Sequence, residues 1–195
     1  MANVNHSALS DPYLHEPKGA STASNGSLYF SDGAGSGSWN HPTHYVGGYV
    51  DFDSASPESQ AISTTFSALD PVFALAENSG FTALSSPNAR IRFDEPETMI
   101  ATISFSTSIR HAAGGTRDVE LALYKNGTII NGAHMIQTTD NDDWNNITLV
   151  GQVEMTTDDY IEVWAKASQN LTLETASAFL TIKGVFKPWK EHSYR

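Results

Sequence analysis

The sequence contains no cysteine, which excludes disulfide bonds, thiolate zinc ligands and a cysteine nucleophile. It has 11 lysine and arginine residues and 22 aspartate and glutamate residues, which gives a formal charge of -11. Nucleic-acid binding needs clustered basic side chains to neutralise phosphates, so it is not expected. No apolar run approaches the roughly 18 residues of a membrane span. We therefore expect neither a nucleic-acid nor a membrane partner, and a fold held by its core and by other subunits.

Charged residues are also scarce, at 17% of the chain against 39% hydrophobic residues. Serine, threonine, asparagine and glycine fill much of the remainder, a balance that suits strands and turns rather than amphipathic helices. A chain of 195 residues is long enough for one sandwich domain and an additional arm.

Two segments carry the clearest strand signals. The run from Met99 to Ile109 predicts a long strand with the period of two that is typical of one buried face. In it Ile103, Phe105, Thr107 and Ile109 alternate with Thr102, Ser104, Ser106 and Ser108. The pair Asn126-Gly127 separates the runs from Val119 to Tyr124 and from Thr128 to Ile136. Asn-Gly supplies the two positive φ angles of a type I′ turn, so these runs predict a β-hairpin.

Other short strands follow one another after residue 44, and no segment shows a sustained helical stripe. The pattern predicts an all-β fold: a jelly-roll-like antiparallel sandwich of about 8–10 strands with an extended irregular N-terminal arm. The remaining expected strands are Tyr45 to Phe52, Gln60 to Leu69, Pro71 to Leu75, Gly80 to Leu84, Ala89 to Phe93, Ile147 to Met155, Tyr160 to Ala167 and Ala178 to Phe186.

Residues 1–43 have little periodicity and too few apolar side chains to fold alone, but a few apolar anchors are spaced along them. We therefore divide the chain into an attachment arm at 1–43, a sandwich at 44–187 and a C-terminal tail at 188–195. The anchors of the arm are Tyr13, Leu14, Leu28, Tyr29, Phe30 and Trp39.

No set of residues predicts catalysis. The sequence has no Gly-x-Ser-x-Gly elbow and no phosphate-binding loop. The acidic pairs Asp142-Asp143 and Asp158-Asp159 fall in expected turns and lack the alternating ligand pattern of a calcium loop. We expect no enzymatic activity, no cofactor and no metal.

Four aromatic residues of the expected strands, Phe105, Tyr124, Tyr160 and Trp164, admit three interpretations. They can line a trimer axis, form ordinary sandwich core or, together with Trp144, present a platform for a saccharide.

The order and spacing of four segments carry a family resemblance: Met99 to Ser106, Val119 to Gly127, Thr157 to Trp164 and Phe179 to Gly184. From about Tyr45 to Val185 the chain resembles the tumour necrosis factor-like and complement-type globular-head jelly rolls, in the versions appended to tailed-bacteriophage virion proteins. The resemblance implies a homotrimer whose three-fold axis is lined by aromatic side chains.

The segments from Leu14 to Ala23 and from Leu28 to Trp39 resemble the opening of phage structural proteins that attach a globular head to a virion. This second resemblance implies that the arm binds the major capsid protein. The residues that it assigns to capsid binding are Tyr13, Leu14, Glu16, Pro17, Lys18, Leu28, Tyr29, Phe30 and Trp39.

The two resemblances predict a virion structural protein, a capsid decoration protein of the cement or head-fibre type that binds the outside of the capsid as a trimer. The alternative is a tail-associated receptor-binding protein that recognises a host surface saccharide through loops such as the one around Trp144. A depolymerase ranks last, because no catalytic residues converge.

Overall fold

The computed structural model describes residues 22–31, 37–51, 56–70, 73–85 and 89–186. The chain divides into two compact units, one formed by Thr43–Lys187 and the other by Met1–Pro42 with Pro188–Arg195. Within the described residues, no helix is long and apolar enough to cross a membrane. The expected C-terminal tail and the anchors Tyr13 and Leu14 lie outside the described residues.

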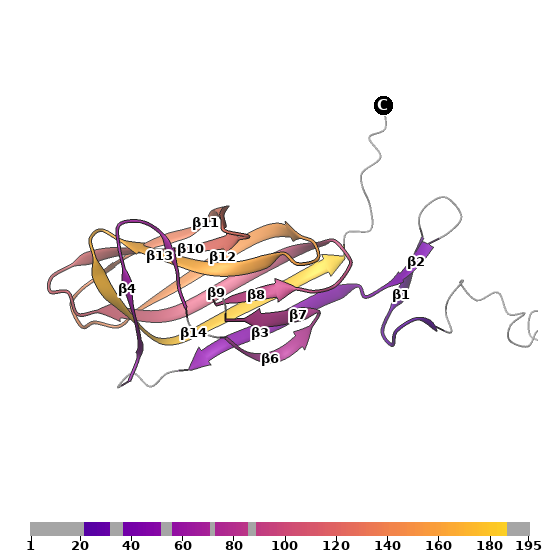
Figure 1. The fold of residues 1–195 in the computed structure, drawn as a ribbon, viewed down its shortest axis with the longest axis horizontal. Helices are drawn as coiled ribbons and strands as arrows, with labels where there is room; N and C mark the ends of the chain where they lie inside the picture. Colours follow the sequence, from indigo (N-terminus) through magenta and orange to yellow (C-terminus); the bar gives the residue numbers. More distant parts are fainter. Residues whose placement is uncertain (1–21, 32–36, 52–55, 71–72, 86–88, 187–195) are drawn as a thin grey trace, which may run out of the picture. The chain divides into compact units, whose positions relative to one another are not determined.

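The larger unit is an antiparallel sandwich of two sheets, drawn as two layers in Figure 1. The first, called the β14 sheet, has the strand order β12-β9-β14-β3-β6, and β4 also pairs with β14. Its strands are β3 (Thr43–Asp51), β4 (Glu58–Ile62), β6 (Ala74–Ser79), β9 (Met99–His111), β12 (Asn145–Met155) and β14 (Leu171–Phe186).

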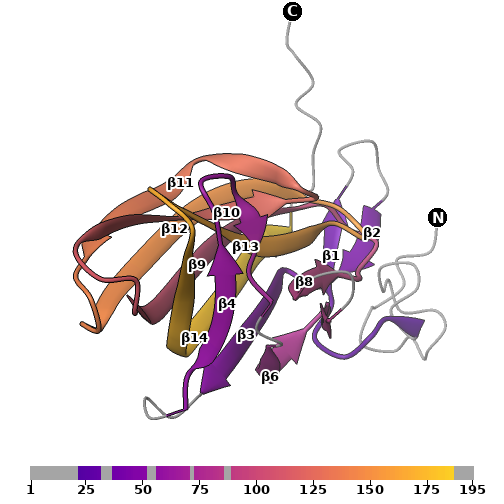
Figure 2. The same ribbon diagram turned by 60° about the vertical axis from the view of Figure 1, so that its left-hand side comes forward.

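The second sheet, called the β13 sheet, has the order β11-β10-β13-β8-β7, and β5 also pairs with β13. Its strands are β5 (Ser67–Ala68), β7 (Phe81–Leu84), β8 (Arg90–Phe93), β10 (Arg117–Lys125), β11 (Thr128–Thr139) and β13 (Tyr160–Ala167). From β8 onward the chain passes between the sheets at almost every connection, only β10 and β11 being hairpin neighbours within one sheet (Figure 2). This is the predicted jelly-roll-like antiparallel sandwich.

The core lies between the sheets and follows the period of two in each strand. In β9, Ile103, Phe105 and Ile109 are fully buried while the serines between them face outward. In β13, Ile161 and Val163 face the same core. Gly48 of β3 also faces it, and a Cβ there would lie 2.7 Å from Ile91 Cδ1, so the strand approaches the core too closely for a side chain.

The predicted Asn-Gly hairpin is confirmed. Lys125 pairs with Thr128, and Asn126 and Gly127 have φ angles of 50° and 72°. Further along this hairpin the register shifts, because four residues of β11, Ile130 to Ala133, lie between the pairs Tyr124–Ile129 and Ala122–His134.

Three expected strands differ from the structure. The expected strand from Gln60 to Leu69 is two strands, β4 and β5, in different sheets. The strand expected at Pro71 to Leu75 occurs later, as β6, and the last strand begins at Leu171 instead of Ala178. β14 is longer because it pairs with β4 over Leu171–Thr175 and then with β3 over Ser177–Val185, and its register against β9 shifts between these two segments.

The smaller unit contains one described hairpin, β1 (Leu28–Ser31) with β2 (Gly37–Asn40). It falls in the arm, which was expected to be irregular. Tyr29 pairs with Trp39, and their rings meet edge to face with centroids 5.4 Å apart.

Candidate assembly surfaces

The outer face of the β14 sheet is a regular grid of side chains from β12, β9, β14 and β3. Because β14 pairs with both β9 and β3, and β9 also pairs with β12, equivalent positions form rows across the four strands. The rows are Thr148-Ser106-Phe179-Tyr49, Val150-Ser104-Thr181-Gly47, Gln152-Thr102-Lys183-Tyr45 and Glu154-Ile100-Val185-Thr43.

Large apolar side chains are exposed on this face although it lies outside the core. Their exposed fractions run from 41% for Tyr49 to 60% for Val150. The rows contain few charges, Lys183 and Glu154 among them. A surface with aromatic residues and few charges is typical of the centre of a protein interface. The exposed apolar residues are Tyr45, Tyr49, Val150, Phe179 and Val185, and we call the surface around them the β14 face.

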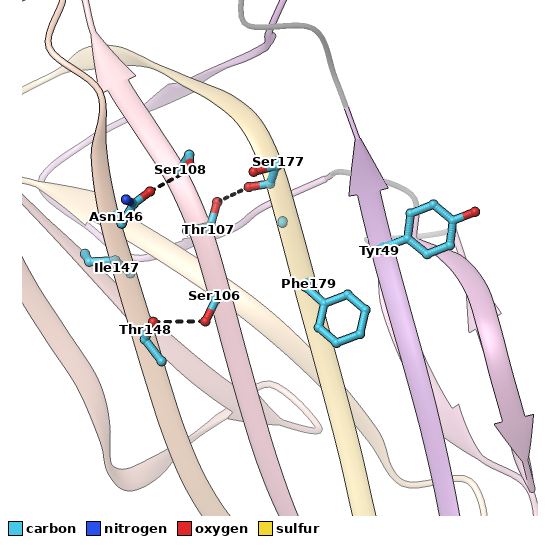
Figure 3. A pocket seen from close by; sticks show the side chains of 10 residues that line it. Tyr49, Ser106, Thr107, Ser108, Asn146, Ile147, Thr148, Ser177 and Phe179 are labelled. Carbon is cyan, nitrogen blue, oxygen red and sulfur yellow. Dashed lines mark hydrogen bonds between the residues drawn. The ribbon is translucent and has the colours of Figure 1, made fainter.

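A shallow groove of about 370 Å³ runs across the β14 face (Figure 3). The Phe179 and Tyr49 rings stand on one side of it, and small polar side chains of β9 and β12 lie on the other. These polar groups bond to one another: Ser106 Oγ lies 2.9 Å from Thr148 Oγ1, and Ser108 donates to Asn146 Oδ1 at 2.6 Å. Among the residues that line the groove, Tyr49 carries the one titratable side chain, and the others are apolar, hydroxyl or amide side chains.

One end of the β14 face is closed by an ion pair. Arg110 Nε donates to Glu174 Oε2 at 2.5 Å, and the guanidinium carbon lies 4.7 Å from the centre of the Trp144 ring. The ring face of Trp144 toward Arg110 is therefore occupied by this cation. The sequence predicts that Trp144 is part of a loop that could bind a saccharide, and the structure places Trp144 beside the Arg110–Glu174 ion pair.

The outer face of the β13 sheet carries a group of paired charges. Glu120 accepts hydrogen bonds from Lys166 Nζ at 2.8 Å and from His134 Nδ1 at 3.0 Å. Burial raises the pKa of the Glu120 carboxyl, but the hydrogen bonds and charges of Lys166 and His134 outweigh it, so the pKa lies below its usual value. The two outer faces therefore differ in their charges, although Ile136 and the Tyr124–Trp164 pair also lie on the outer side of the β13 sheet.

The structure separates the four aromatic residues that were predicted as one set. Phe105 lies in the core and is 1% exposed. Tyr124 and Trp164 stack on the outer side of the β13 sheet with ring centroids 4.3 Å apart, and the Arg90 guanidinium lies 4.4 Å from the centre of the Tyr160 ring. The four side chains therefore do not form one surface.

The predicted arm residues are described in part. Leu28, Tyr29, Phe30 and Trp39 all belong to the β1–β2 hairpin, where Leu28 is 54% exposed. The other predicted capsid-binding residues, Tyr13, Leu14, Glu16, Pro17 and Lys18, lie outside the described residues.

The acidic pairs Asp142-Asp143 and Asp158-Asp159 form hydrogen bonds and ion pairs with neighbouring residues. Asp159 is bound by Lys125 Nζ at 2.7 Å and by the Thr156 N–H at 2.8 Å, while Asp158 is 78% exposed at the side chain. Asp142 adopts a φ of 63° and its backbone N–H donates to the carbonyl of His111. Among the described residues, no three histidine or acidic side chains are grouped so that they could hold a metal ion.

Sequence reasoning missed Tyr45, Tyr49, Phe179 and Val185 as surface residues. Both expected strands that contain them were identified, but Tyr45 to Val50 carries apolar side chains at odd and even positions alike. The period of two therefore could not tell the core face from the outer face. The register between β3 and β14 resolves the choice, because Val46 and Ile182 are paired and buried.

No family model matches the chain, and no curated protein matches it. Solved structures resemble it at low identity. Murine APRIL at pH 5.0 is 15% identical over 73% of this chain and 99% of that chain, with a TM-score of 0.45. Eiger TNF from S. frugiperda is 8% identical over 78% and 99%, with a TM-score of 0.47. The PRD1 vertex protein P5 is 8% identical over 76% and 100%, with a TM-score of 0.41.

Proposed function

We propose that this chain is a virion structural protein of a tailed bacteriophage, a capsid decoration protein of the cement or head-fibre type. In this proposal the sandwich forms a homotrimer, and the arm binds the major capsid protein on the outside of the capsid. The structural observation that carries the assembly is the β14 face, and the virion role rests on the sequence resemblance of the arm.

The β14 face supports self-association because it exposes apolar side chains that a solitary sandwich would leave in water. It has two unlike strips: aromatic residues of β3 and β14, such as Tyr49 and Phe179, and small hydroxyl residues of β9 and β12, such as Ser106 and Thr148. When one strip of each copy packs on the other strip of the next, the contact is heterologous, and such contacts form a ring when the rotation between copies closes. A ring of three places the β14 face of every copy toward the axis.

The arm supports attachment because its apolar residues belong to a unit separate from the sandwich. A two-stranded hairpin is marginally stable alone in water, so a partner surface that covers Leu28, Tyr29 or Trp39 would stabilise it. Three arms on one trimer would bind together with an affinity well above that of one arm.

The trimer is tested with the full chain and two matched variants. Size-exclusion chromatography with light scattering measures the mass of the wild type, Phe179→Asp and Ile136→Asp. Ile136 is the control because it is 60% exposed on β11, away from the β14 face. We expect trimers of the wild type and Ile136→Asp and monomers of Phe179→Asp. A monomeric wild type, or a trimeric Phe179→Asp, would refute the assembly.

Attachment is tested by cosedimentation of the full chain with capsids that lack it. We expect the wild type to bind and Trp39→Ala to bind at least about tenfold more weakly while remaining trimeric. Wild-type trimers that ignore capsids but are retained on immobilised host surface saccharide would instead support the receptor-binding function.

A further inference from the structure

The sequence contains three Asn-Gly pairs, Asn25-Gly26, Asn126-Gly127 and Asn131-Gly132. Glycine after asparagine is the sequence that favours spontaneous deamidation, because no Cβ hinders the backbone nitrogen when it approaches the side-chain amide carbon. Two of the pairs lie in the same hairpin of the sandwich, one in its turn and one in its second strand. They allow the effect of the fold on one reaction to be compared within one molecule.

The Asn126 amide is held away from this reaction. Its Nδ2 donates to Asp159 Oδ1 at 2.5 Å, and its Oδ1 accepts from the backbone N–H of Tyr160 at 2.9 Å. The Asn126 backbone N–H also donates to the Tyr160 carbonyl at 3.1 Å. Moving the amide carbon toward the Gly127 nitrogen would break both side-chain hydrogen bonds.

Asn131 has none of these restraints. It lies among the four β11 residues that have no register partner on β10, and β11 is the terminal strand of its sheet. Its side chain is exposed, and no hydrogen bond to its amide occurs among the described residues. Gly132 has a φ of 78°, and a Cβ built on it would meet no atom within 4 Å. Neighbouring atoms therefore do not crowd the side of Gly132 on which a Cβ would stand.

We propose that Asn131 is a site of spontaneous deamidation in the folded protein and that Asn126 is protected. The Gly132 backbone nitrogen loses its proton and forms a bond to Asn131 Cγ. The Cγ–Nδ2 bond breaks, and Nδ2 takes up a proton and leaves as ammonia. Water then opens the resulting succinimide at either carbonyl. The product is an aspartyl or an isoaspartyl residue.

Both products add one negative charge beside a shallow groove lined by Ile130, Gln152 and Val153, and the isoaspartyl form also adds one carbon to the backbone of β11. The extra carbon falls inside the existing bulge, before the regular pairing that starts at His134. The sandwich should therefore remain folded after the modification, and modified chains should accumulate with age. The site is independent of the proposed virion role.

The experiment incubates the full chain in mildly alkaline buffer, with and without denaturing urea. Mass spectrometry follows deamidation at Asn126 and at Asn131 separately. Urea gives each Asn-Gly pair its unfolded rate, so the ratio of native to unfolded rates isolates the effect of the fold. Because two hydrogen bonds must break, we expect native Asn126 to react about tenfold or more slowly than in urea, and Asn131 to react at nearly its unfolded rate. Equal protection of the two sites, or none at either, overturns the proposal.

Two variants sharpen the assignment. Asn131→Gln should abolish deamidation at position 131 in the folded protein, since the longer side chain would have to close a less favourable ring. Asp159→Asn removes the negative charge from the acceptor of the Asn126 amide, which weakens this hydrogen bond, and should speed deamidation at Asn126 relative to Asn131. Measuring each rate against the urea rate of the same variant separates the effect of the fold from the intrinsic reactivity of the sequence. An unchanged Asn126 rate in native Asp159→Asn would contradict the protective role of this contact.

Discussion

Asn126 and Asp159 join two turns of the β13 sheet, the hairpin turn of β10–β11 and the turn that leads into β13. The carboxylate also binds the Lys125 ammonium at 2.7 Å and the Thr156 N–H at 2.8 Å. Asp159 is a buried acid whose oxygens are bound from three directions, so its charge contributes to stability.

We predict that Asp159→Asn lowers the free energy of unfolding by about 1–3 kcal/mol at neutral pH, because hydrogen bonds to a charged group are lost or weakened. Urea unfolding at one protein concentration measures the change. The control is Asp158→Asn, whose exposed side chain and positive φ tolerate asparagine, so its change should stay within about 0.5 kcal/mol. Equal losses in the two variants would remove the special role of Asp159.

The stability lost in Asp159→Asn should also depend on pH. Burial raises the pKa of Asp159, but Lys125, Thr156 and Asn126 lower it more, so the folded pKa lies below the usual value. The stabilisation is therefore complete above the unfolded pKa of about 3.9 and is lost as the pH falls through the folded pKa. The stability gap between wild type and Asp159→Asn should narrow in acid, and a gap that is constant with pH would contradict this.

Local signals were sufficient where the sequence has one regular period. The alternation in β9 and the Asn-Gly turn both appear in the structure as predicted, because each depends on neighbouring residues. The break between β4 and β5 could not be predicted in this way. Gln60 bonds to the Ala68 carbonyl and the Asp70 N–H, and these contacts hold the turn that carries the chain to the other sheet.

The β14 face was beyond prediction for a related reason. One of its rows joins Tyr49 to Phe179, which are far apart in the sequence, and the row exists only because β3 and β14 pair in one register. The predicted aromatic set contains residues that point to different sides, since Phe105 is in the core and Trp164 lies on the outer side of the β13 sheet. Residue type alone does not tell a core aromatic from a surface one.

Truncating two phenylalanines should separate these roles. Phe105→Ala leaves a cavity in the core and should lower the free energy of unfolding by about 3–5 kcal/mol. Phe179→Ala removes a ring that is 48% exposed, so it should weaken trimer formation and leave the stability of a single sandwich nearly unchanged. Unfolding at several protein concentrations distinguishes them, because only an association defect depends on concentration. The assignment fails if Phe179→Ala is as destabilising as Phe105→Ala at every concentration.

Glu58 of β4 should be a source of instability. Burial raises the pKa of its carboxyl, the charge of Asp70 raises it further, and Oε2 has no hydrogen-bond partner among the described residues. A raised folded pKa stabilises the fold only while Glu58 is protonated, and that contribution is lost as the pH rises through the folded pKa. Glu58→Gln should therefore stabilise the protein by about 0.5 kcal/mol at neutral pH and by less in acid. The exposed Glu77→Gln is the control, and a stabilisation that persists undiminished in acid would refute the electrostatic cause.

The β1–β2 hairpin can be broken without touching the sandwich. A Cβ on Gly37 would collide with the Phe30 carbonyl, which is backbone and cannot move aside as a flexible side chain would, and with the Tyr29 ring. Gly37→Ala should therefore disrupt the pairing that brings Tyr29 to Trp39 and lower capsid binding by about tenfold or more.

Ser38→Ala, at an exposed neighbouring position, should bind as the wild type does. Because the sandwich is a separate unit, both variants should remain trimeric by light scattering. Undiminished capsid binding by Gly37→Ala would show that the hairpin does not carry the attachment.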